Sequence, residues 1–148
     1  MSIAETSARP TDVAEVRTVL EAVASGLRGR DAAAVARHFA PGARIFDLAP
    51  PLMRSGADGA ELQKWIDGWD GPVDTRTRDL EVEVDGDLAV AHGLEQTNVA
   101  RDGEDIAWWA RVTTVLRRTS EGWRITHAHS SVPFHMDGSY RAAIDLEP

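Results

Sequence analysis

A carboxylate in an apolar segment of the sequence could act as a general acid or base. Asp47 stands between Phe46 and residues 48–51, which read Leu-Ala-Pro-Pro. If this segment is buried, loss of hydration raises the carboxyl pKa toward neutrality, where proton transfer is most effective. The alternative is a strand-end aspartate that hydrogen-bonds the following loop. The sequence leaves both interpretations open.

Arg111 and His92 each lie within an apolar segment that is predicted to be a strand. A buried guanidinium must bind an anion, so Arg111 could hold a substrate carboxylate or enolate, or pair with Asp47 and lower its pKa. A structural salt bridge would explain it equally well. A neutral imidazole at His92 could move a proton, although a hydrogen-bonded core histidine is the commoner explanation.

His127 and His129 are two positions apart and therefore share one face of a predicted strand. No third ligand is evident in the sequence, so we expect no metal site. Strict alternation places both histidines opposite Ala128 and Val132, where they could contact a second copy of the chain, but a bulge would reverse this. The sequence has no glycine-rich phosphate loop, nucleophile elbow or His-Glu-x-x-His motif. We therefore expect no cofactor.

Three tryptophans, Trp65, Trp69 and Trp109, are expected to form an apolar wall. Trp65 and Trp69 are spaced i, i+4 on a predicted helix, while the adjacent Trp108 and Trp109 must face opposite sides of a sheet. One of the adjacent pair is expected in the core or substrate site, and the other at an interface. Ordinary core packing is the more frequent role of such residues.

The elements that position these residues follow from hydrophobic periodicity. Helices are predicted to begin at Thr11 or Asp12, at Asp31 and at Asp58. A short strand is predicted at 43–48, and longer strands at 79–85, 88–99, 106–118 and 123–134. Helices followed by strands indicate an α+β fold, in which three N-terminal helices wrap a curved antiparallel sheet and leave an internal pocket in the resulting cone. We expect a flexible lead-in at 1–10, one domain at 11–134 and a loosely held tail at 135–148.

Composition excludes several classes of protein. The chain has 148 residues, a formal net charge of −8 and no cysteine. The acidic balance disfavours nucleic acid as a partner, and no apolar run approaches the roughly 20 residues that a membrane span needs. We expect a soluble, cytoplasmic protein that binds no membrane.

Two segments resemble a known family. Residues 39–47 (FAPGARIFD) and 109–134 (WARVTTVLRRTSEGWRITHAHSSVPF) resemble the SnoaL-like branch of the nuclear-transport-factor-2-like superfamily. The His-x-His-x-Ser sequence at 127–131 is also similar to the association domain of calcium/calmodulin-dependent protein kinase II. The resemblance covers residues 12–134. It implies a cone of curved sheet and helices, usually dimeric through the outer face of the sheet.

The resemblance implies several possible functions, because the superfamily contains isomerases, polyketide cyclases, dehydratases, epoxide hydrolases and non-catalytic binding or assembly domains. It places Asp47 at the position of the proton-transferring acid. Steroid isomerases carry a tyrosine and a protonated aspartic acid as oxyanion donors, where this chain has Val23 and Arg111. The changed donors argue against steroid isomerisation by that mechanism.

We therefore expect an enzyme that transfers protons without a cofactor on a small hydrophobic, carbonyl-containing metabolite, and thereby acts as a cyclase, isomerase or lyase of the dehydratase type. Asp47 would move the proton, Arg111 would hold developing negative charge and His92 would assist. A non-catalytic ligand-binding or oligomerisation domain is the alternative, and a homodimer is expected in either case. The residues expected to bind the substrate are Val23, Phe39, Trp65, Trp69, Trp109, Thr113, Ala128 and Val132.

Overall fold

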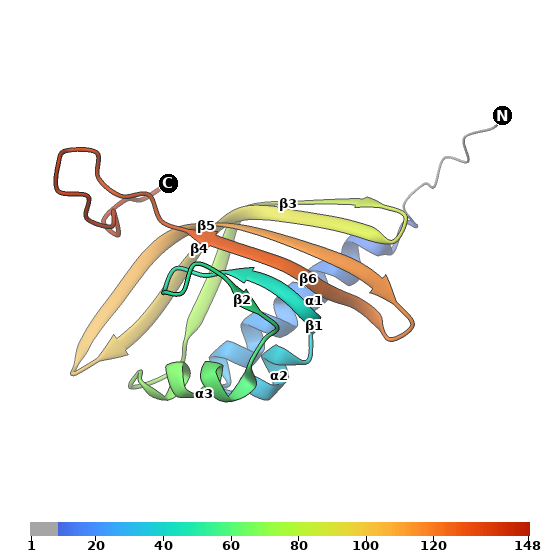
Figure 1. Cartoon of the computed structure of the whole chain (residues 1–148), viewed down its shortest axis with the longest axis horizontal. Helices are drawn as coiled ribbons and strands as arrows, with labels where there is room; N and C mark the ends of the chain where they lie inside the picture. Colours follow the sequence, from blue (N-terminus) through green and yellow to red (C-terminus); the bar gives the residue numbers. More distant parts are fainter. Residues whose placement is uncertain (1–8) are drawn as a thin grey trace.

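The computed structural model describes residues 9–148, so most of the predicted lead-in lies outside the described residues. These residues form helices on one side of a curved, unclosed sheet (Figure 1). The α+β prediction is confirmed. The helices are α1 (Asp12–Arg28), α2 (Ala32–Ala36) and α3 (Gly59–Asp67), and the strands are β1 (Phe39–Phe46), β2 (Arg54–Ser55), β3 (Asp74–Asp85), β4 (Leu88–Arg101), β5 (Glu104–Thr119) and β6 (Gly122–Ser131).

The sheet has the strand order β2-β1-β6-β5-β4-β3. The four long strands β3 to β6 form the predicted antiparallel meander, in which each strand pairs with the next along the chain. The pairing of β1 with β6 is parallel, and β2 adds a two-residue antiparallel edge to β1. The sequence prediction missed β2 because two residues are too few to show alternation.

Irregularities in the pairing accompany the bend of the sheet. The register between β3 and β4 shifts after Arg78, where Asp79 adopts a φ of 55°. A side chain at Gly93 would come within 3.0 Å of the Arg78 carbonyl oxygen and 3.1 Å of the Leu80 Cα atom. In the pairing of β5 with β6, a second register shift leaves Thr126 as an extra residue, since Val115 pairs with His127 and Leu116 with Ile125. Bulges of this kind bend a strand and increase its twist.

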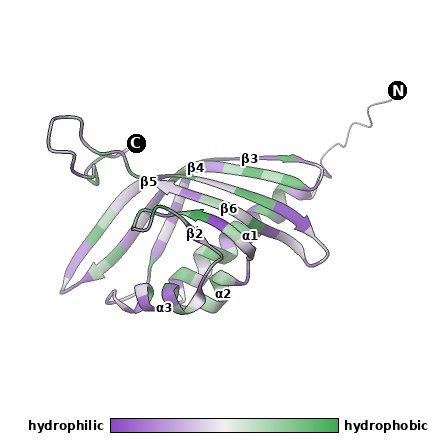
Figure 2. Ribbon diagram, in the orientation of Figure 1, coloured by the Kyte–Doolittle hydropathy of each residue, from purple (hydrophilic) through white to green (hydrophobic). Residues whose placement is uncertain are grey.

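The helices cover only one face of the sheet, which we call the concave face; the opposite one is the convex face (Figure 1). Hydrophobic and hydrophilic residues alternate along the long strands (Figure 2). The core beneath α1 is centred on Val16, Ala89, Leu116, Trp123 and Ile125. A second cluster beneath α3 is centred on Ala32, Ile66, Val73 and Val99.

Two predicted helix caps are confirmed. The Asp31 carboxylate accepts a hydrogen bond from the Ala34 amide at 3.0 Å, and the Asp58 carboxylate accepts one from the Ala60 amide at 2.9 Å. These bonds satisfy amide groups that a helix start leaves without partners. Within residues 9–148, no helix is both long enough and apolar enough to cross a membrane.

A charged network ties the start of α1 to the end of β5. Arg118 donates to Asp12 at 2.7 Å and to Asp87 at 3.0 Å, and its guanidinium lies 4.5 Å from the ring centroid of Trp123. The Trp123 indole donates in turn to Glu15 at 3.1 Å. The hydrogen bond from Arg118 is the main cause that holds the pKa of Asp12 below its usual value of 3.8.

Replacing Arg118 with methionine should therefore destabilise the protein most above about pH 4. The carboxylate of Asp12 is 1% exposed and would lose its charged partner. A lowered pKa contributes stability above the unfolded-state value, and this contribution is lost as the pH falls through the folded-state pKa. Urea unfolding at pH 7 and pH 3 measures the difference in the free energy of unfolding between variant and wild type. Arg117→Met, on the exposed opposite face of β5, is the control. If Arg118→Met lowered the free energy of unfolding by the same amount at both pH values, this account would be contradicted.

Candidate functional site

The register of β4 and β5 decides which residues face the helices. Leu116 is 0% exposed in the core beneath α1. The pairing of β4 with β5 runs without a shift from Leu88 to Arg101, so every second residue of each strand shares a face. Residues 106, 108, 110, 112 and 114 of β5 therefore lie on the concave face with Leu116, together with residues 91, 93, 95, 97 and 99 of β4.

Glu95 is a carboxylate on this concave face that the sequence analysis missed. It pairs with Ala110 on β5 and with Thr77 on β3, and it lies near the middle of β4. Desolvation by the surrounding protein raises the pKa of its carboxyl group. A carboxyl group in such surroundings is able to take up and release a proton closer to neutral pH than an exposed glutamate.

Asp47 lies on the same side of the sheet, just beyond the end of β1. Ile45 pairs with Ala128, which packs on the core beneath α1, and the position two residues further on continues that side. The side chain remains accessible to water, yet the surrounding protein raises the pKa of the Asp47 carboxyl group by desolvation, while the charge of Arg54 opposes the increase. The direction is the one expected for a buried Asp47, although the residue itself is exposed.

The arginine next to Asp47 is Arg54, not Arg111 as the sequence suggested. It belongs to β2 and pairs with Ile45, so it shares the concave side with Asp47. Its guanidinium donates to the Pro50 carbonyl oxygen at 3.0 Å. The arginine is therefore held by the loop that separates β1 from β2, next to the carboxylate that it influences.

The two carboxyl groups stand on either side of the concave face. Asp47 follows β1 and Glu95 lies on β4, with β6 and β5 between these strands. Neighbouring strands are about 4.8 Å apart, which gives a separation of roughly 14 Å measured along the sheet, and the curvature shortens the direct path. A molecule that contacts both groups would have to span this separation, and a shared proton between them is excluded.

Three tryptophans form one wall at the α3 end of the concave face. The Trp65 and Trp69 ring centroids are 6.0 Å apart, and those of Trp69 and Trp108 are 6.4 Å apart. Arg101 lies over the Trp69 ring at 4.2 Å. Among the described residues, the buried indole nitrogens of Trp69 and Trp108 have no hydrogen-bond acceptor. Trp69 and Trp108 pack against the core beneath α3, and Trp108, not the predicted Trp109, is the strand residue next to the helix tryptophans.

The predicted positions of Arg111, Trp109, Thr113 and His92 are wrong. The register places all four on the convex face, because they alternate with the residues that pack beneath the helices. Arg111 is exposed there, and His92 Nε2 lies 3.7 Å from a carboxylate oxygen of Glu81. The structure therefore does not bring Arg111 or His92 together with the carboxylate of the candidate site.

The remaining residues of the predicted substrate site lie on the helix side of the sheet or next to it. Val23, Phe39 and Ala128 pack against the core beneath α1. Val132 directly follows β6 and is partly buried. Val23 and Phe39 therefore contribute to packing between α1 and the sheet. Ala128 of β6 lies beside Ile45 of β1, the strand that leads to Asp47.

His127 and His129 lie on the convex face, opposite Ala128 as expected, and a register shift between Ile125 and His127 separates them from the buried face of Ile125. Their rings both contact Phe46 edge-on, with centroid distances of 4.8 Å and 5.4 Å. The Nδ1 atom of His127 is 2.8 Å from the Arg44 carbonyl oxygen, which makes this nitrogen the donor. Within residues 9–148, no three histidine, aspartate or glutamate side chains are arranged to hold a metal ion.

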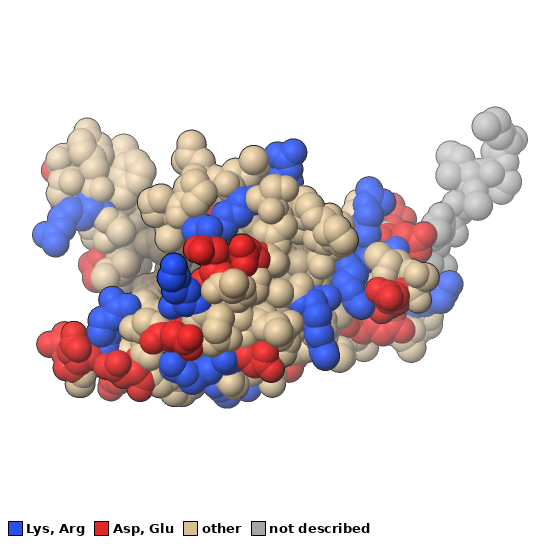
Figure 3. Space-filling model, turned by 60° about the horizontal axis from the view of Figure 1, so that its bottom comes forward, with Lys and Arg blue, Asp and Glu red and all other residues tan. Residues whose placement is uncertain are grey.

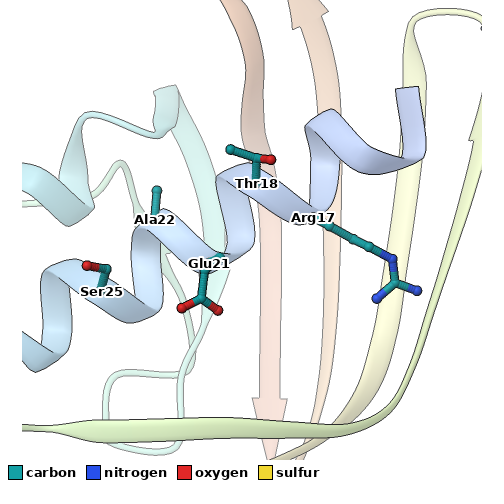
Figure 4. Close-up of a pocket in the computed structure, with 5 residues that line it drawn as sticks. All are labelled: Arg17, Thr18, Glu21, Ala22 and Ser25. Atoms are coloured by element: carbon teal, nitrogen blue, oxygen red, sulfur yellow. The ribbon is translucent and has the colours of Figure 1, made fainter. Parts of the chain in front are cut away.

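Two shallow depressions of the surface lie at α1, away from both carboxyl groups of the candidate site. One is lined by Arg17, Thr18, Glu21, Ala22 and Ser25, which all project from the same helix (Figure 4). The other lies between α1 and α2 and reaches His38, whose pKa is lowered mainly by desolvation. Acidic and basic side chains are interspersed on the helix side of the molecule (Figure 3). Neither depression includes Asp47 or Glu95, so the candidate site is defined by these two carboxyl groups and not by a surface depression.

Comparisons with known proteins agree with this architecture. The family model described as SnoaL-like domain matches residues 16–135. A search of curated proteins gave no match. The chain is similar to the crystal structure of a nuclear-transport-factor-2-like protein of unknown function from Pseudomonas putida KT2440, with 27% identity, a TM-score of 0.85 and coverage of 96% of this chain and 100% of that one.

Two further solved structures share the fold at lower identity. A candidate calcium/calmodulin-dependent protein kinase II association domain from Xanthomonas campestris is 20% identical, with a TM-score of 0.71 and coverage of 88% of this chain and 96% of that one. A candidate dehydratase of the nuclear-transport-factor-2-like family from Streptomyces avermitilis is 20% identical, with a TM-score of 0.72 and coverage of 82% and 95%. At 20% identity, the similarity to these two structures shows a shared fold.

Proposed function

This chain belongs to the SnoaL-like domain family, and we propose that it is an enzyme that transfers protons on a hydrophobic, carbonyl-containing metabolite without a cofactor. Elimination of water or isomerisation is the favoured outcome. The observation that carries the proposal is the placement of two carboxyl groups, Asp47 and Glu95, on one concave face beside a tryptophan wall. Their pKa values are both raised by desolvation.

The two carboxyl groups differ in the way that acid–base catalysis requires. Arg54 partly offsets the desolvation of Asp47, which favours its ionised form and the role of general base. Glu95 is affected by desolvation alone, which favours its protonated form and the role of general acid. Asp47 would remove a proton from the carbon next to the carbonyl group, and Glu95 would donate a proton to a hydroxyl group at the opposite end of a conjugated ring system, which leaves as water.

The tryptophan wall supports a flat, apolar substrate. Trp65 is 41% exposed and offers aromatic surface, and it is backed by Trp69 and Trp108. The candidate dehydratase of similar fold is consistent with elimination of water. A ring compound that carries a ketone and a hydroxyl group meets these requirements.

The proposal is tested by exchange of carbon-bound hydrogen in D2O. With a panel of cyclic hydroxyketones, the protein should accelerate loss of the 1H NMR signal next to the carbonyl group for at least one compound. Asp47→Asn should reduce the enzymatic rate by about 10²-fold or more, the scale expected for a positioned general base. Asp105→Asn, at the exposed start of β5, should not. Exchange at the buffer rate with every compound, or an unchanged rate in Asp47→Asn, would refute the proposal.

We also propose a second role, in which another copy of the chain covers the convex face. The specific observation is an aromatic and apolar surface on that face. Phe46 contacts both histidines edge-on, and Leu94 and Trp109 lie on the same side. Since the helices occupy only the opposite face, nothing within residues 9–148 packs over these strands as a second layer. The candidate association domain of similar fold supports an assembly role.

A further inference from the structure

The segment that follows β6 is a folded projection, which we call the C-terminal arm (residues 133–148). The Phe134 and Ala142 backbones form an isolated antiparallel bridge. The Ala143 amide donates to the Pro133 carbonyl oxygen at 2.8 Å, and His135 Nε2 lies 2.9 Å from the Asp145 carboxylate. These contacts close the arm on itself, in contrast to the loosely held tail that the sequence suggested.

The arm presents most of its large apolar side chains to solvent. Ala143 is 2% exposed and closes the base of the arm. By contrast, the exposed fraction is 81% for Met136 and 51% for Ile144, and Phe134, Tyr140 and Leu146 are also exposed. A cluster of this kind on an ordered segment marks a surface that another molecule covers.

The arm borders a patch of the convex face that has matching properties. Arg78 of the patch donates to the Pro148 carbonyl oxygen at 3.4 Å, and the arm leaves the sheet on the side away from the helices (Figure 1). The cross-strand register places Arg76, Arg78, Leu94, Trp109 and Arg111 next to one another on β3, β4 and β5. We call these five residues the arginine–tryptophan patch.

Charge on the arm and the patch is of opposite sign. The patch holds three arginines in a chain whose net charge is −8. The Arg76 guanidinium lies 5.6 Å from the Trp109 ring centroid, which forms a flat cationic surface. The arm carries Asp137, Asp145 and Glu147 against a single arginine, Arg141. Complementary charge of this kind selects and orients partners.

We infer that the C-terminal arm of one copy docks on the arginine–tryptophan patch of a second copy, and that a twofold axis makes this exchange reciprocal. The arm lies beside the patch of its own chain but keeps its apolar side chains exposed, so the covering surface must come from another molecule. Because arm and patch are neighbours on one chain, a twofold axis brings each arm onto the other patch in a single interface. This inference rests on the proposed assembly role.

Sedimentation equilibrium of the full chain tests the inference first. The wild type is expected to be a dimer. Met136→Glu on the arm and Arg111→Glu on the patch should each raise the dissociation constant by at least about tenfold, as substitutions at an interface centre do. Leu52→Glu is the matched control, because Leu52 is 97% exposed and belongs to neither surface. It should leave the dissociation constant unchanged.

Mixing the two variants distinguishes docking between chains from packing within one chain. In a heterodimer of Met136→Glu with Arg111→Glu, the intact arm of the second chain docks on the intact patch of the first. In each homodimer, every contact between an arm and a patch carries a substitution. With the two variants mixed in equal amounts, native mass spectrometry should therefore show a heterodimer fraction well above the statistical one, in which the heterodimer is only twice as abundant as each homodimer. No enrichment of the heterodimer would overturn the arm inference alone, as would a wild-type dimer that both variants leave unchanged. A monomeric wild type would overturn the assembly role as well.

Discussion

Replacing Glu95 with glutamine is expected to lower kcat for a substrate found by hydrogen exchange by about 10²- to 10⁴-fold, the usual contribution of a positioned general acid or base. Glutamine keeps the shape of the side chain and its ability to hydrogen-bond, but it cannot donate a proton to a departing oxygen. The loss should therefore appear mainly in kcat, with a smaller change in KM.

The same substitution should stabilise the folded protein at neutral and higher pH. Burial disfavours the ionised form of Glu95, so the folded state binds its proton more tightly than the unfolded state does. The free energy of unfolding of the wild type consequently falls as the pH rises from the usual pKa of 4.5 through the folded-state value. Glutamine does not titrate, so it lacks this dependence. In urea unfolding, the stability of the variant should therefore exceed that of the wild type most at pH 8 and least at pH 4.

Glu83→Gln is the matched control for both measurements. Glu83 lies on the convex side of β3, paired with Val90, and is exposed. Its substitution should change neither kcat nor the pH dependence of stability. A Glu95→Gln variant that retains full kcat would remove Glu95 from the mechanism. A Glu95→Gln variant that is less stable than the wild type at pH 8 would contradict the claim that burial destabilises the ionised form of Glu95.

The largest expected effect on stability comes from Leu116→Ala, which should cost about 2–5 kcal/mol, the range for loss of a large side chain from a packed core. Leu116 is 0% exposed and belongs to the cluster that joins α1 to the sheet. Removal of three carbons there leaves a cavity between Val16 and Ile125, because neither a helix nor a paired strand can collapse fully onto it.

Urea unfolding at pH 7 measures this cost, with Leu88→Ala as the comparison. Leu88 begins β4 and is 38% exposed, so the same chemical change should cost about 1 kcal/mol or less. Equal losses in the two variants would show that α1 does not depend on this cluster. The near-UV circular dichroism of Leu116→Ala should also weaken, since Trp123 belongs to the same cluster.

Local signals account for much of what the sequence predicted. Asp31 and Asp58 cap helices as expected, because an aspartate before a helical segment can satisfy free amides wherever the helix packs. Alternation and tight turns likewise predict the antiparallel meander, since each strand pairs with its neighbour in the chain. The predicted strand at 79–85 nevertheless begins at Asp74 in the structure. Its first part has no alternating apolar residues to mark it.

Long-range contacts determine the rest of the sheet. The parallel pairing of β1 with β6 joins residues that are more than 80 positions apart, such as Arg44 and His127. No local pattern carries that information. Arg54 reaches the candidate site through the two-residue strand β2, which becomes regular structure only because β1 is there to pair with it.

The sequence by itself determined which residues of each strand share a face, but only the tertiary structure decided which face the helices cover. In β4, Val90 and Leu94 suggested an inward face that would include His92, yet the helices pack on Ala89 and Ala91 instead. Small residues suit that face because they let the helices approach the strands closely. Alternation is the same on both faces of a strand, so Glu95 could be assigned to the site only after the packing partner was known.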